Sequence, residues 1–372
     1  MQRRPSQPRA DWRATVESQG LNFHSPDEQT YWDESVYYSF TSSEIDAVEK
    51  ATYALDKMCL AAVEHVVANN LFDQFQIPIL FHNYLKRSWD RDEITIVGRF
   101  DLAYDGHSPP KLLEYNADTP TSLLEAAVIQ WNWHKDTKTG SDQFNSIHER
   151  LIEAWGRLPK TDKVYFTGMS DDLEDFTTVT YLQDTATQAG LATEFLDIST
   201  MGWDNNRRIF VDQSALAIHR CFKLYPWEWL INESFGPYLT TDTVQWLEAP
   251  WKMLLSNKQI LVVLSQLFPQ SEYLLPAAAQ PIGNTYVKKP LLSREGANVT
   301  IVRGGQIAQQ NDGPYADIPV IYQQLFDLPN FDGHHAVLGS WMVNGYACGM
   351  GIREDASLIT GNRSRFVPHV IE

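Results

Sequence analysis

The sequence predicts an α+β fold made of roughly two or three subdomains, one of them a small α/β domain. Three patterns indicate this fold: a long amphipathic segment over residues 42–72, a β-hairpin followed by a helix over residues 94–133, and a strand–helix–strand unit over residues 163–199. A chain of 372 residues, 43% of them hydrophobic, is also long enough to bury a large core.

The long helix is predicted first along the chain. Over residues 42–72, apolar residues recur at spacings of three and four behind a Ser/Glu start that resembles a capping box. The hairpin follows as an alternating strand, a turn-rich break at 105–110 and a second strand, after which a helix opens near Thr121. From Lys163, the segments VYFTGM and ATEFLDIS are predicted strands on either side of a helix over residues 172–189.

The C-terminal part is predicted to form a lid over a nucleotide. It begins with a helix after Asn257 (KQILVVLSQLF), continues through the strand TYVKKP and the loop LLSREGANV, and closes with strands joined by turns such as Asn344-Gly345. Charged residues also gather at a glycine-bounded strand end near the C-terminus, which suggests a site, although isolated charges there are more often solvent-facing: Arg353, Glu354, Asp355, Arg363 and Arg365.

Composition excludes several classes of function. The net charge is −17, from 30 Lys and Arg against 47 Asp and Glu, and such a chain repels a nucleic-acid backbone. The longest apolar stretch, over residues 260–268, is far shorter than the ~20 residues that a membrane span requires. The three cysteines have neither disulfide-framework nor zinc-site spacing. We therefore expect a cytoplasmic protein with no nucleic-acid or membrane partner.

The hairpin carries four polar residues that share one face. Arg99 and Asp101 are two apart on the first strand, and Glu114 and Asn116 are two apart on the second. If Tyr104 pairs with Lys111, Asp101 lies opposite Glu114, with Cα atoms about 4.5 to 5.5 Å apart. Two carboxylates and an amide oxygen then converge, as Mg²⁺ bound to phosphates requires. The alternative is a solvated face, but facing acids without a cation would repel each other.

A triphosphate needs cationic side chains and a glycine-containing loop beside the metal. Lys258 precedes an apolar helix, and Lys289 ends a strand just before the loop with Arg294, Glu295 and Gly296. Each feature alone is weak, because single lysines are usually surface charges, and the combination is what indicates a phosphate site. The segment 322–325 is either an adenine-binding strand or a plain core strand.

At this point the ordered motifs RFD, LLEYNADT, SNK, VKKPLLSREGAN, IYQQLFDLP and GIREDASLIT resemble the synthetase domain of the glutathionylspermidine synthase family. The resemblance runs from about residue 20 to the end. It implies a permuted ATP-grasp fold, with the metal motifs before the phosphate lysines. It also implies four parts: an N-terminal tail and entry segment over 1–40, a metal-binding part over 41–155, a pre-ATP-grasp-like α/β substrate domain over 156–250, and a lid with nucleotide-binding residues over 251–372.

The resemblance assigns roles to individual residues. It implies Mg²⁺ ligands at Asp101, Glu114 and Asn116, and catalytic arginines at Arg99 and Arg353. The acid would contact Thr119 and the amine Glu174, beside Asp175, which replaces a glutamate of the family. The implied ATP contacts are Lys258, Lys289, Arg294, Glu295, Gly296, Gln323, Gln324, Leu325, Phe326, Leu358, Ile359 and Thr360.

The sequence also departs from the family pattern. Leu224 replaces a threonine that contacts glutathione, Val337 a glutamine near ATP, and Arg365 an acid near the polyamine. An arginine beside a polycation would be repulsive, which argues against spermidine itself. The N-terminal amidase domain of the bifunctional members is not found in the sequence, so amide hydrolysis is not expected.

The sequence therefore predicts an ATP- and Mg²⁺-dependent ligase that joins a small-molecule or peptide acid to an amine through an acyl phosphate. Two alternatives use the same site. One is a phosphotransferase or ATPase that forms no amide, and the other is a nucleotide-binding module without catalysis. The sequence leaves the acid, the amine, the oligomeric state and the order of the glycine loop without nucleotide open.

Overall fold

The computed structural model describes residues 1–362 and 364–372. Its core is an antiparallel sheet with strand order β19-β18-β17-β3-β4, in which β16 pairs with β17. This central sheet is made of β3 (Val97–Ala103), β4 (Lys111–Asn116), β16 (Asn330–Phe331), β17 (His334–Val343), β18 (Tyr346–Asp355) and β19 (Arg365–Val367). The predicted turn at Asn344-Gly345 joins β17 to β18, and both residues have the positive φ that such a two-residue turn requires.

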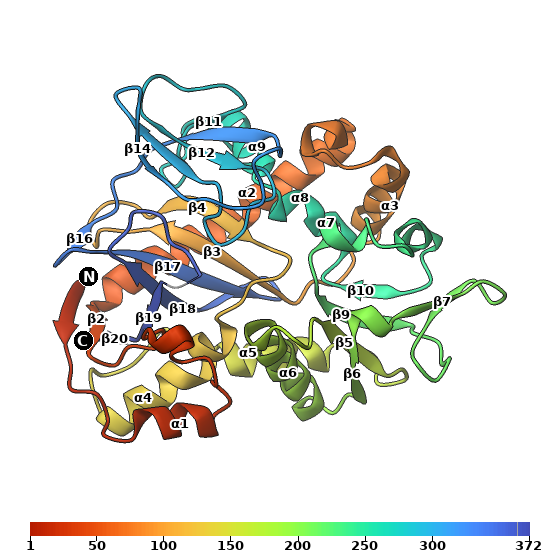
Figure 1. The fold of residues 1–372 in the computed structure, drawn as a ribbon, viewed down its shortest axis with the longest axis horizontal. Helices are drawn as coiled ribbons and strands as arrows, with labels where there is room; N and C mark the ends of the chain where they lie inside the picture. The colour runs from red at the N-terminus through yellow and green to blue at the C-terminus, as the bar shows by residue number, and fades with distance from the viewer. Residues whose placement is uncertain (363) are drawn as a thin grey trace.

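A second, antiparallel sheet, named the lid sheet below, faces the central sheet (Figure 1). Its strand order is β11-β15-β12-β13-β14. The lid sheet is made of β11 (Ala277–Ala278), β12 (Tyr286–Pro290), β13 (Thr300–Arg303), β14 (Gln306–Gln310) and β15 (Val320–Gln324). The helix α9 (Gln259–Leu267), which the apolar run after Asn257 predicts, precedes this sheet. It packs against α2 (Ser42–Ala68) and β11.

A small α/β unit lies at the other side of the central sheet (Figure 1). Its four strands are parallel, in the order β10-β9-β5-β6, and α6 (Leu173–Gln188) crosses from β5 to β6. The parallel strands are β5 (Val164–Gly168), β6 (Thr193–Asp197), β9 (Arg220–Leu224) and β10 (Gln245–Leu247). The carboxyl ends of parallel strands are the usual place for ligand-binding residues, and here the segments after β5 and β9 face the centre of the molecule.

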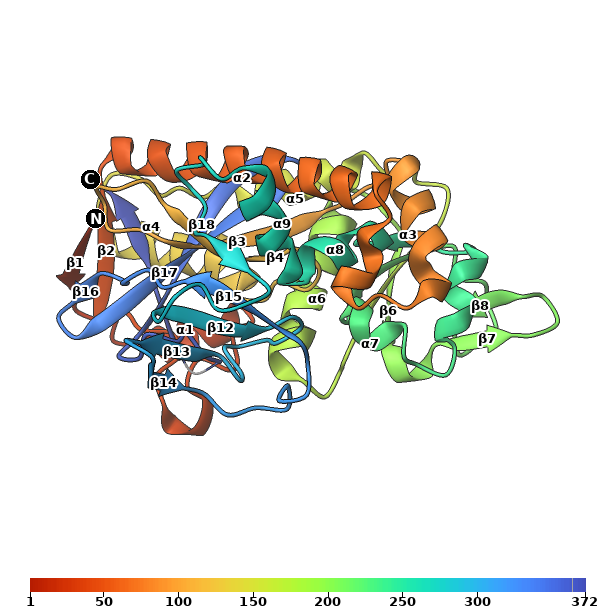
Figure 2. The same cartoon turned by 90° about the horizontal axis from the view of Figure 1, so that it is seen from above.

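The long helix α2 (Ser42–Ala68) runs along one face of the assembly (Figure 2). Its first turn is closed by a capping box, in which the Glu44 amide donates to the Thr41 hydroxyl at 3.3 Å and the Thr41 amide donates to Glu44 Oε2 at 2.7 Å. The cap is thus Thr41, one residue before the predicted start. In the described part of the chain, no helix combines the length and apolar character of a membrane span.

The remaining elements cover the edges. A small sheet of order β1-β2-β20 brings the two ends of the chain together, and β7 pairs with β8 in a hairpin that projects from the α/β unit. These strands are β1 (Gln2–Pro5), β2 (Val36–Phe40), β20 (His369–Ile371), β7 (Gly202–Asp204) and β8 (Ile209–Val211). The other helices are α1 (Trp12–Ser18), α3 (Ile79–Asp90), α4 (Gln130–Thr137), α5 (Ile147–Gly156), α7 (Trp227–Leu230) and α8 (Met253–Ser256).

Candidate active site

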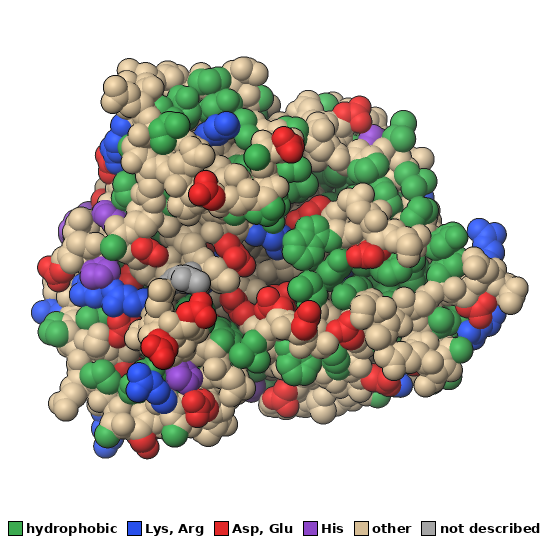
Figure 3. All heavy atoms as spheres, in the orientation of Figure 1, with side chains coloured by type: hydrophobic (Ala, Val, Ile, Leu, Met, Phe, Trp, Pro, Cys, Tyr) green, Lys and Arg blue, Asp and Glu red, His purple; other side chains and the backbone are tan. Residues whose placement is uncertain are grey.

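Two cavities meet at the β3–β4 hairpin. The central cavity, of about 210 Å³, lies between the central sheet, the α/β unit and the glycine loop after β12, and the space-filling view shows acidic side chains around its opening (Figure 3). The sheet cavity, of about 110 Å³, lies between the lid sheet and the central sheet. Asp101 and Glu114 line both, as do Gly296, Val337 and Thr360. The hairpin carboxylates therefore stand where the two cavities join.

The predicted register of the hairpin is correct at the four polar residues and wrong at the turn. Arg99 pairs with Asn116 and Asp101 with Glu114, so the four polar residues share one patch. Lys111, however, pairs with Ala103 rather than with Tyr104, and a bulge between Asp101 and Leu102 absorbs the extra residue. The bulge offsets the one-residue shift at the turn. The predicted partners of the two acids are therefore correct although the predicted turn pair is not.

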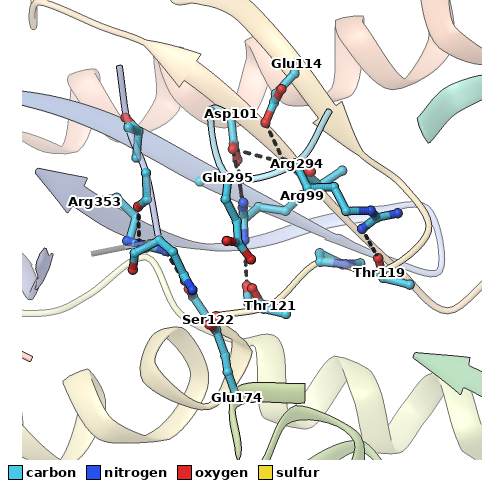
Figure 4. Close-up of a pocket in the computed structure, with 18 of the residues that line it drawn as sticks. Arg99, Asp101, Glu114, Thr119, Thr121, Ser122, Glu174, Arg294, Glu295 and Arg353 are labelled. Carbon is cyan, nitrogen blue, oxygen red and sulfur yellow. Dashed lines mark hydrogen bonds and ion pairs between the residues drawn. The ribbon is translucent and has the colours of Figure 1, made fainter. Parts of the chain in front are cut away.

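Hydrogen bonds and ion pairs connect the polar residues of the hairpin. Arg99 donates Nε to Asp101 Oδ1 at 2.7 Å and Nη2 to Oδ2 at 3.1 Å, and its third arm reaches the Thr121 carbonyl at 2.6 Å (Figure 4). The side-chain Nδ2 of Asn116 donates to Asp101 Oδ2 at 3.0 Å and to Glu114 Oε1 at 3.4 Å. Glu114 forms an ion pair with Lys258 at 3.2 Å.

The two facing carboxylates differ in electrostatic environment. Burial raises the pKa of Asp101 despite the opposing effect of Arg99. Burial also acts to raise the pKa of Glu114, but Lys258 and Lys289 outweigh it and bring that pKa to about 2. Glu114 is therefore ionised at neutral pH. In the described residues no group of three or more His, Cys, Asp or Glu is placed to hold a metal, so any cation here would be held by two carboxylates and the Asn116 amide oxygen.

The sheet cavity has a cationic end and an apolar end. Lys289 donates to the Leu113 carbonyl at 2.9 Å and to Gln323 Oε1 at 2.7 Å, while Lys258 donates to the Ser293 carbonyl at 2.6 Å. Burial lowers the pKa of Lys289 to about 8. The other end is walled by aliphatic side chains from the lid sheet and the segment after β18: Val287, Val299, Ile301, Leu325, Leu358 and Ile359. This combination suits a ligand with a flat apolar part and a polyanionic part.

The central cavity contains an arginine without a carboxylate partner in the described part of the chain. Arg353 donates to the carbonyls of Ser364, Gly361 and Asn362 at 2.9, 2.9 and 3.1 Å, and to the Ser122 hydroxyl at 3.2 Å. All of these acceptors are neutral. The charge of Arg353 is therefore available to an anion in the cavity.

The same cavity also has an acidic rim. Asp172, Glu174 and Asp175 come from the N-terminal end of α6, and Glu295 from the glycine loop. Burial and the neighbouring acids Asp172 and Glu174 raise the pKa of Asp175 to about 7. Gathered carboxylates of this kind favour a positively charged ligand group.

All residues to which the resemblance assigns a catalytic, metal, ATP or substrate contact line at least one of the two cavities. Those on the central cavity are Arg99, Asp101, Glu114, Asn116, Thr119, Glu174, Asp175, Arg294, Glu295, Gly296, Arg353 and Thr360. Those on the sheet cavity include Lys258, Lys289, Gln323, Gln324, Leu325, Phe326, Leu358 and Ile359. The segment 322–325 is thus both the end of a core strand and part of a cavity wall.

Neither Arg365 nor Leu224 lines either cavity, so these residues give no reason to exclude a polycation. Arg365 lines neither cavity, and its guanidinium is neutralised by Asp33 at 2.8 Å and Glu354 at 2.7 Å. Leu224 is buried in the core with 1% of its surface exposed, so it does not face a substrate. Val337 does line both cavities. Arg363 of the charged tail lies outside the described residues.

Sequence reasoning missed the residues that hold the site together. Glu228 on α7 accepts from Arg294 at 2.8 and 3.2 Å, and the other arm of Arg294 donates to the Thr119 hydroxyl at 2.6 Å. Asp118, inside the motif EYNAD, forms a fully buried ion pair with Lys223 and accepts from the Trp227 amide at 2.8 Å. These partners are 66 to 175 positions apart along the chain, and a single sequence carries no signal for such pairs.

Comparison with known proteins identifies a family of related synthetases. A family model described as glutathionylspermidine synthase preATP-grasp matches residues 3–372. A Haemophilus influenzae protein whose provisional name is acid–amine ligase is 41% identical, over 94% of this chain and 93% of its own length. Trypanothione synthetase of Crithidia fasciculata is 30% identical, over 78% of this chain and 50% of its own length.

Two further matches complete the comparison. The bifunctional glutathionylspermidine synthetase/amidase of Escherichia coli is 28% identical, over 90% of this chain and 59% of its own length, so the chain spans between half and three fifths of the two longer relatives. The solved structure of a glutathione synthetase-like effector from Globodera pallida has the same fold, with a TM-score of 0.58 at 11% identity over 97% of this chain and 96% of the effector. This chain belongs to the glutathionylspermidine synthase family.

Proposed function

We propose that this protein is an ATP- and Mg²⁺-dependent ligase that joins a carboxylic acid to an amine through an acyl phosphate, on a permuted ATP-grasp scaffold. The observation that carries the proposal is the meeting of the two cavities at Asp101 and Glu114. A γ-phosphate delivered from the sheet cavity would reach an acid held in the central cavity at this point. The unpaired cysteines fit the cytoplasmic location that we propose.

The residues suit Mg²⁺. Asp101, Glu114 and Asn116 offer oxygen ligands on one face of a hairpin, and the low pKa of Glu114 keeps it ionised. When bound there, Mg²⁺ would neutralise phosphate charge and orient the γ-phosphate for transfer. Lys258 and Lys289 supply the remaining positive charge, and the aliphatic end of the sheet cavity accepts the adenine.

The central cavity divides between the two other substrates. Arg353 would contact the carboxylate of the acid substrate, and Arg99 pairs with Asp101 on the same cavity. The two arginines would stabilise the negative charge that develops during phosphoryl transfer and amine attack. The acidic rim of Glu174, Asp175 and Glu295 would hold the ammonium group of the amine. On this proposal, residues 41–155 hold the metal, 156–250 the substrates, and 251–372 the nucleotide.

The proposal is tested by ADP release from purified protein with MgATP and a panel of acids and amines, with products followed by mass. Glutathione and spermidine are the first pair, because the names of relatives include them. We expect release that requires both an acid and an amine, and a product lighter than their sum by one water. Release with no amide would indicate a phosphotransferase or ATPase, and no release on any pair would indicate a nucleotide-binding module.

Replacing Lys289 with methionine is expected to weaken MgATP binding by about tenfold or more, because a buried charge-assisted contact is worth roughly 1.5 to 3 kcal/mol. Titration calorimetry with a non-hydrolysable ATP analogue and Mg²⁺ measures the change. Lys288→Met is the matched control, since Lys288 is the neighbour on the same strand and lines neither cavity. Equal affinities for the two variants would refute the assignment of Lys289.

Amine affinity is expected to depend on pH through Asp175. Its pKa of about 7 means that the carboxyl becomes negative as the pH rises through 7, so the KM for the amine should fall over that range. Asp175→Asn should remove this dependence, whereas Asp184→Asn, an exposed position further along α6, should keep it. Initial rates at varied amine concentration, at about one pH unit on either side, measure the effect. The same pH dependence in both variants would contradict the placement of the amine.

A further inference from the structure

A chain of hydroxyl groups leads from the central cavity to a buried carboxyl. Ser122 lines the cavity, and its hydroxyl lies 3.0 Å from the hydroxyl of Tyr31. The Tyr31 hydroxyl in turn donates to Glu125 Oε1 at 2.6 Å. This path is continuous at hydrogen-bond distances and connects the cavity wall to a side chain that does not itself reach the cavity.

The cavity end of this chain lies at the place where the proposed reaction occurs. Arg353 donates to the Ser122 hydroxyl at 3.2 Å, and Arg99 donates to the carbonyl of the preceding residue, Thr121, at 2.6 Å (Figure 4). Ser122 also has a left-handed backbone, with φ of 62°, which is unusual for serine. The Ser122 hydroxyl therefore accepts from one of the two proposed catalytic arginines, and the backbone just before it accepts from the other.

The buried end of this hydroxyl path, Glu125, is suited to bind and release a proton near neutral pH. Glu125 is 1% exposed and begins a π-helical turn over Glu125–Ile129, a distortion frequent at functional sites. Burial, and then the charge of Glu174, raise its pKa to about 7, against the lowering effects of Tyr31 and Arg353. Burial raises the pKa of Tyr31 well above its usual value, so this phenol stays protonated at neutral pH.

We propose that Ser122, Tyr31 and Glu125 form a proton relay that accepts the proton of the attacking amine. The inference rests on the proposed function. The attacking ammonium group first gives one proton to solvent. The neutral nitrogen then attacks the acyl phosphate carbonyl, the C–N bond forms, and phosphate leaves with the electron pair of the C–O bond. The positively charged nitrogen gives its proton to Ser122 Oγ, the serine proton passes to Tyr31, and the tyrosine proton passes to Glu125. The proton returns along the same path to the departing phosphate, so Glu125 is a carboxylate again after each turnover.

The relay separates two tasks that the acidic rim cannot perform together. A rim carboxylate that binds an ammonium group is stabilised in its charged form, and it is therefore a weak base. Glu125 is removed from the cavity by two hydroxyl groups, so it stays basic without attracting the amine directly. We therefore expect Glu125 to govern kcat and the rim residue Asp175 to govern the KM for the amine.

The test compares two nucleophiles on the Glu125→Gln variant, which keeps the size of the side chain and an acceptor for Tyr31. The acid is the one that drives ADP release in the panel, with glutathione first. With spermidine as the amine, kcat should fall about 100-fold or more, the lower range for general base catalysis. With hydroxylamine, which is neutral and weakly basic and traps the acyl phosphate without a base, the rate of hydroxamate formation should stay within about twofold of the parent rate.

Two further variants and a pH profile exclude a merely structural role. Tyr31→Phe should reproduce the loss, whereas Tyr38→Phe should not, because Tyr38 is an equally buried tyrosine whose hydroxyl donates to Glu354 at 2.8 Å away from both cavities. In the parent protein, kcat with the amine should rise as the pH passes through about 7, and Glu125→Gln should abolish this rise.

The outcomes separate the relay from the function on which it rests. If the parent protein makes amide and hydroxamate, and Glu125→Gln makes both at parental rates at every pH, the relay is refuted and the ligase stands. If Glu125→Gln loses hydroxamate as severely as amide, Glu125 supports the fold or the first half-reaction, and the relay is again refuted. A parent protein that makes neither product with any acid of the panel overturns the proposed function and the relay with it.

Discussion

Asp101→Asn is expected to lower ATP-dependent ligation by about three orders of magnitude or more, because a catalytic metal contributes several kcal/mol to the transition state. Asp101 faces Glu114 across the hairpin and lines both cavities, so the substitution removes charge at the point where they join. The variant should also lose its response to Mg²⁺. Steady-state ADP release over a range of Mg²⁺ concentrations measures both effects.

A matched control distinguishes loss of the metal site from loss of the fold. Asp46→Asn changes an exposed aspartate on α2 that lines neither cavity, and it should leave turnover and thermal unfolding unchanged. Asp101→Asn should unfold cooperatively and retain some nucleotide binding through the lid sheet. Near-normal ligation by Asp101→Asn, with an unaltered Mg²⁺ requirement, would refute the metal assignment.

The largest effect on stability is expected from Lys223→Met. The ammonium group of Lys223 is fully buried, pairs with Asp118, donates to the Tyr225 carbonyl at 3.1 Å and lies 4.6 Å from the centre of the Trp227 ring. Removing it leaves the Asp118 carboxylate buried without a cation. Such a loss costs about 3 to 5 kcal/mol of unfolding free energy. Urea unfolding at neutral pH measures the change.

Two companion variants test the cause of this destabilisation. Lys163→Met removes a half-exposed lysine that pairs with Glu194 on the neighbouring strand, and it should cost only about 0 to 1 kcal/mol. The double variant Lys223→Met/Asp118→Asn should be more stable than Lys223→Met alone, because the uncompensated charge is gone. If the double variant is the less stable of the two, the buried pair is not the source of the effect.

This ion pair also has a consequence for function. Asp118 lies two residues after Asn116 and next to Thr119, and it fixes the start of α7 through the Trp227 amide. Glu228, the next residue of α7, holds Arg294 of the glycine loop. The contact chain connects the hairpin, the α/β unit and the lid at the edge of the central cavity. Weakening it should therefore lower affinity for the nucleotide as well as stability.

Local patterns predicted the hairpin and the long helices well. The two-residue periodicity of a strand places Arg99 and Asp101 on one face whatever the rest of the chain does, and the structure confirms it. The helices predicted after Asn257 and over residues 172–189 are present as α9 and α6. In each case the signal lies within a few turns of chain and depends on little else.

Long-range partners could not be predicted in the same way. The sequence predicts Arg365 near the amine, yet in β19 its guanidinium pairs with Asp33 and Glu354. Asp33 is 332 residues away along the chain, so no local pattern indicates this pair. The bulge in β3–β4 and the fully buried Lys223 likewise depend on packing between segments. Cavity walls are shared among such segments, so the site residues were found through the family resemblance more than through pattern.

An oxygen-isotope experiment tests directly whether the γ-phosphate is transferred to the carboxyl group of the acid. The acid that supports ligation is labelled with ¹⁸O in its carboxyl group, and the phosphate released during amide formation is analysed by mass. The acyl phosphate predicts one labelled oxygen in each phosphate, because the C–O bond breaks on the carbon side. Phosphate without label, or release of AMP in place of ADP, would contradict the account.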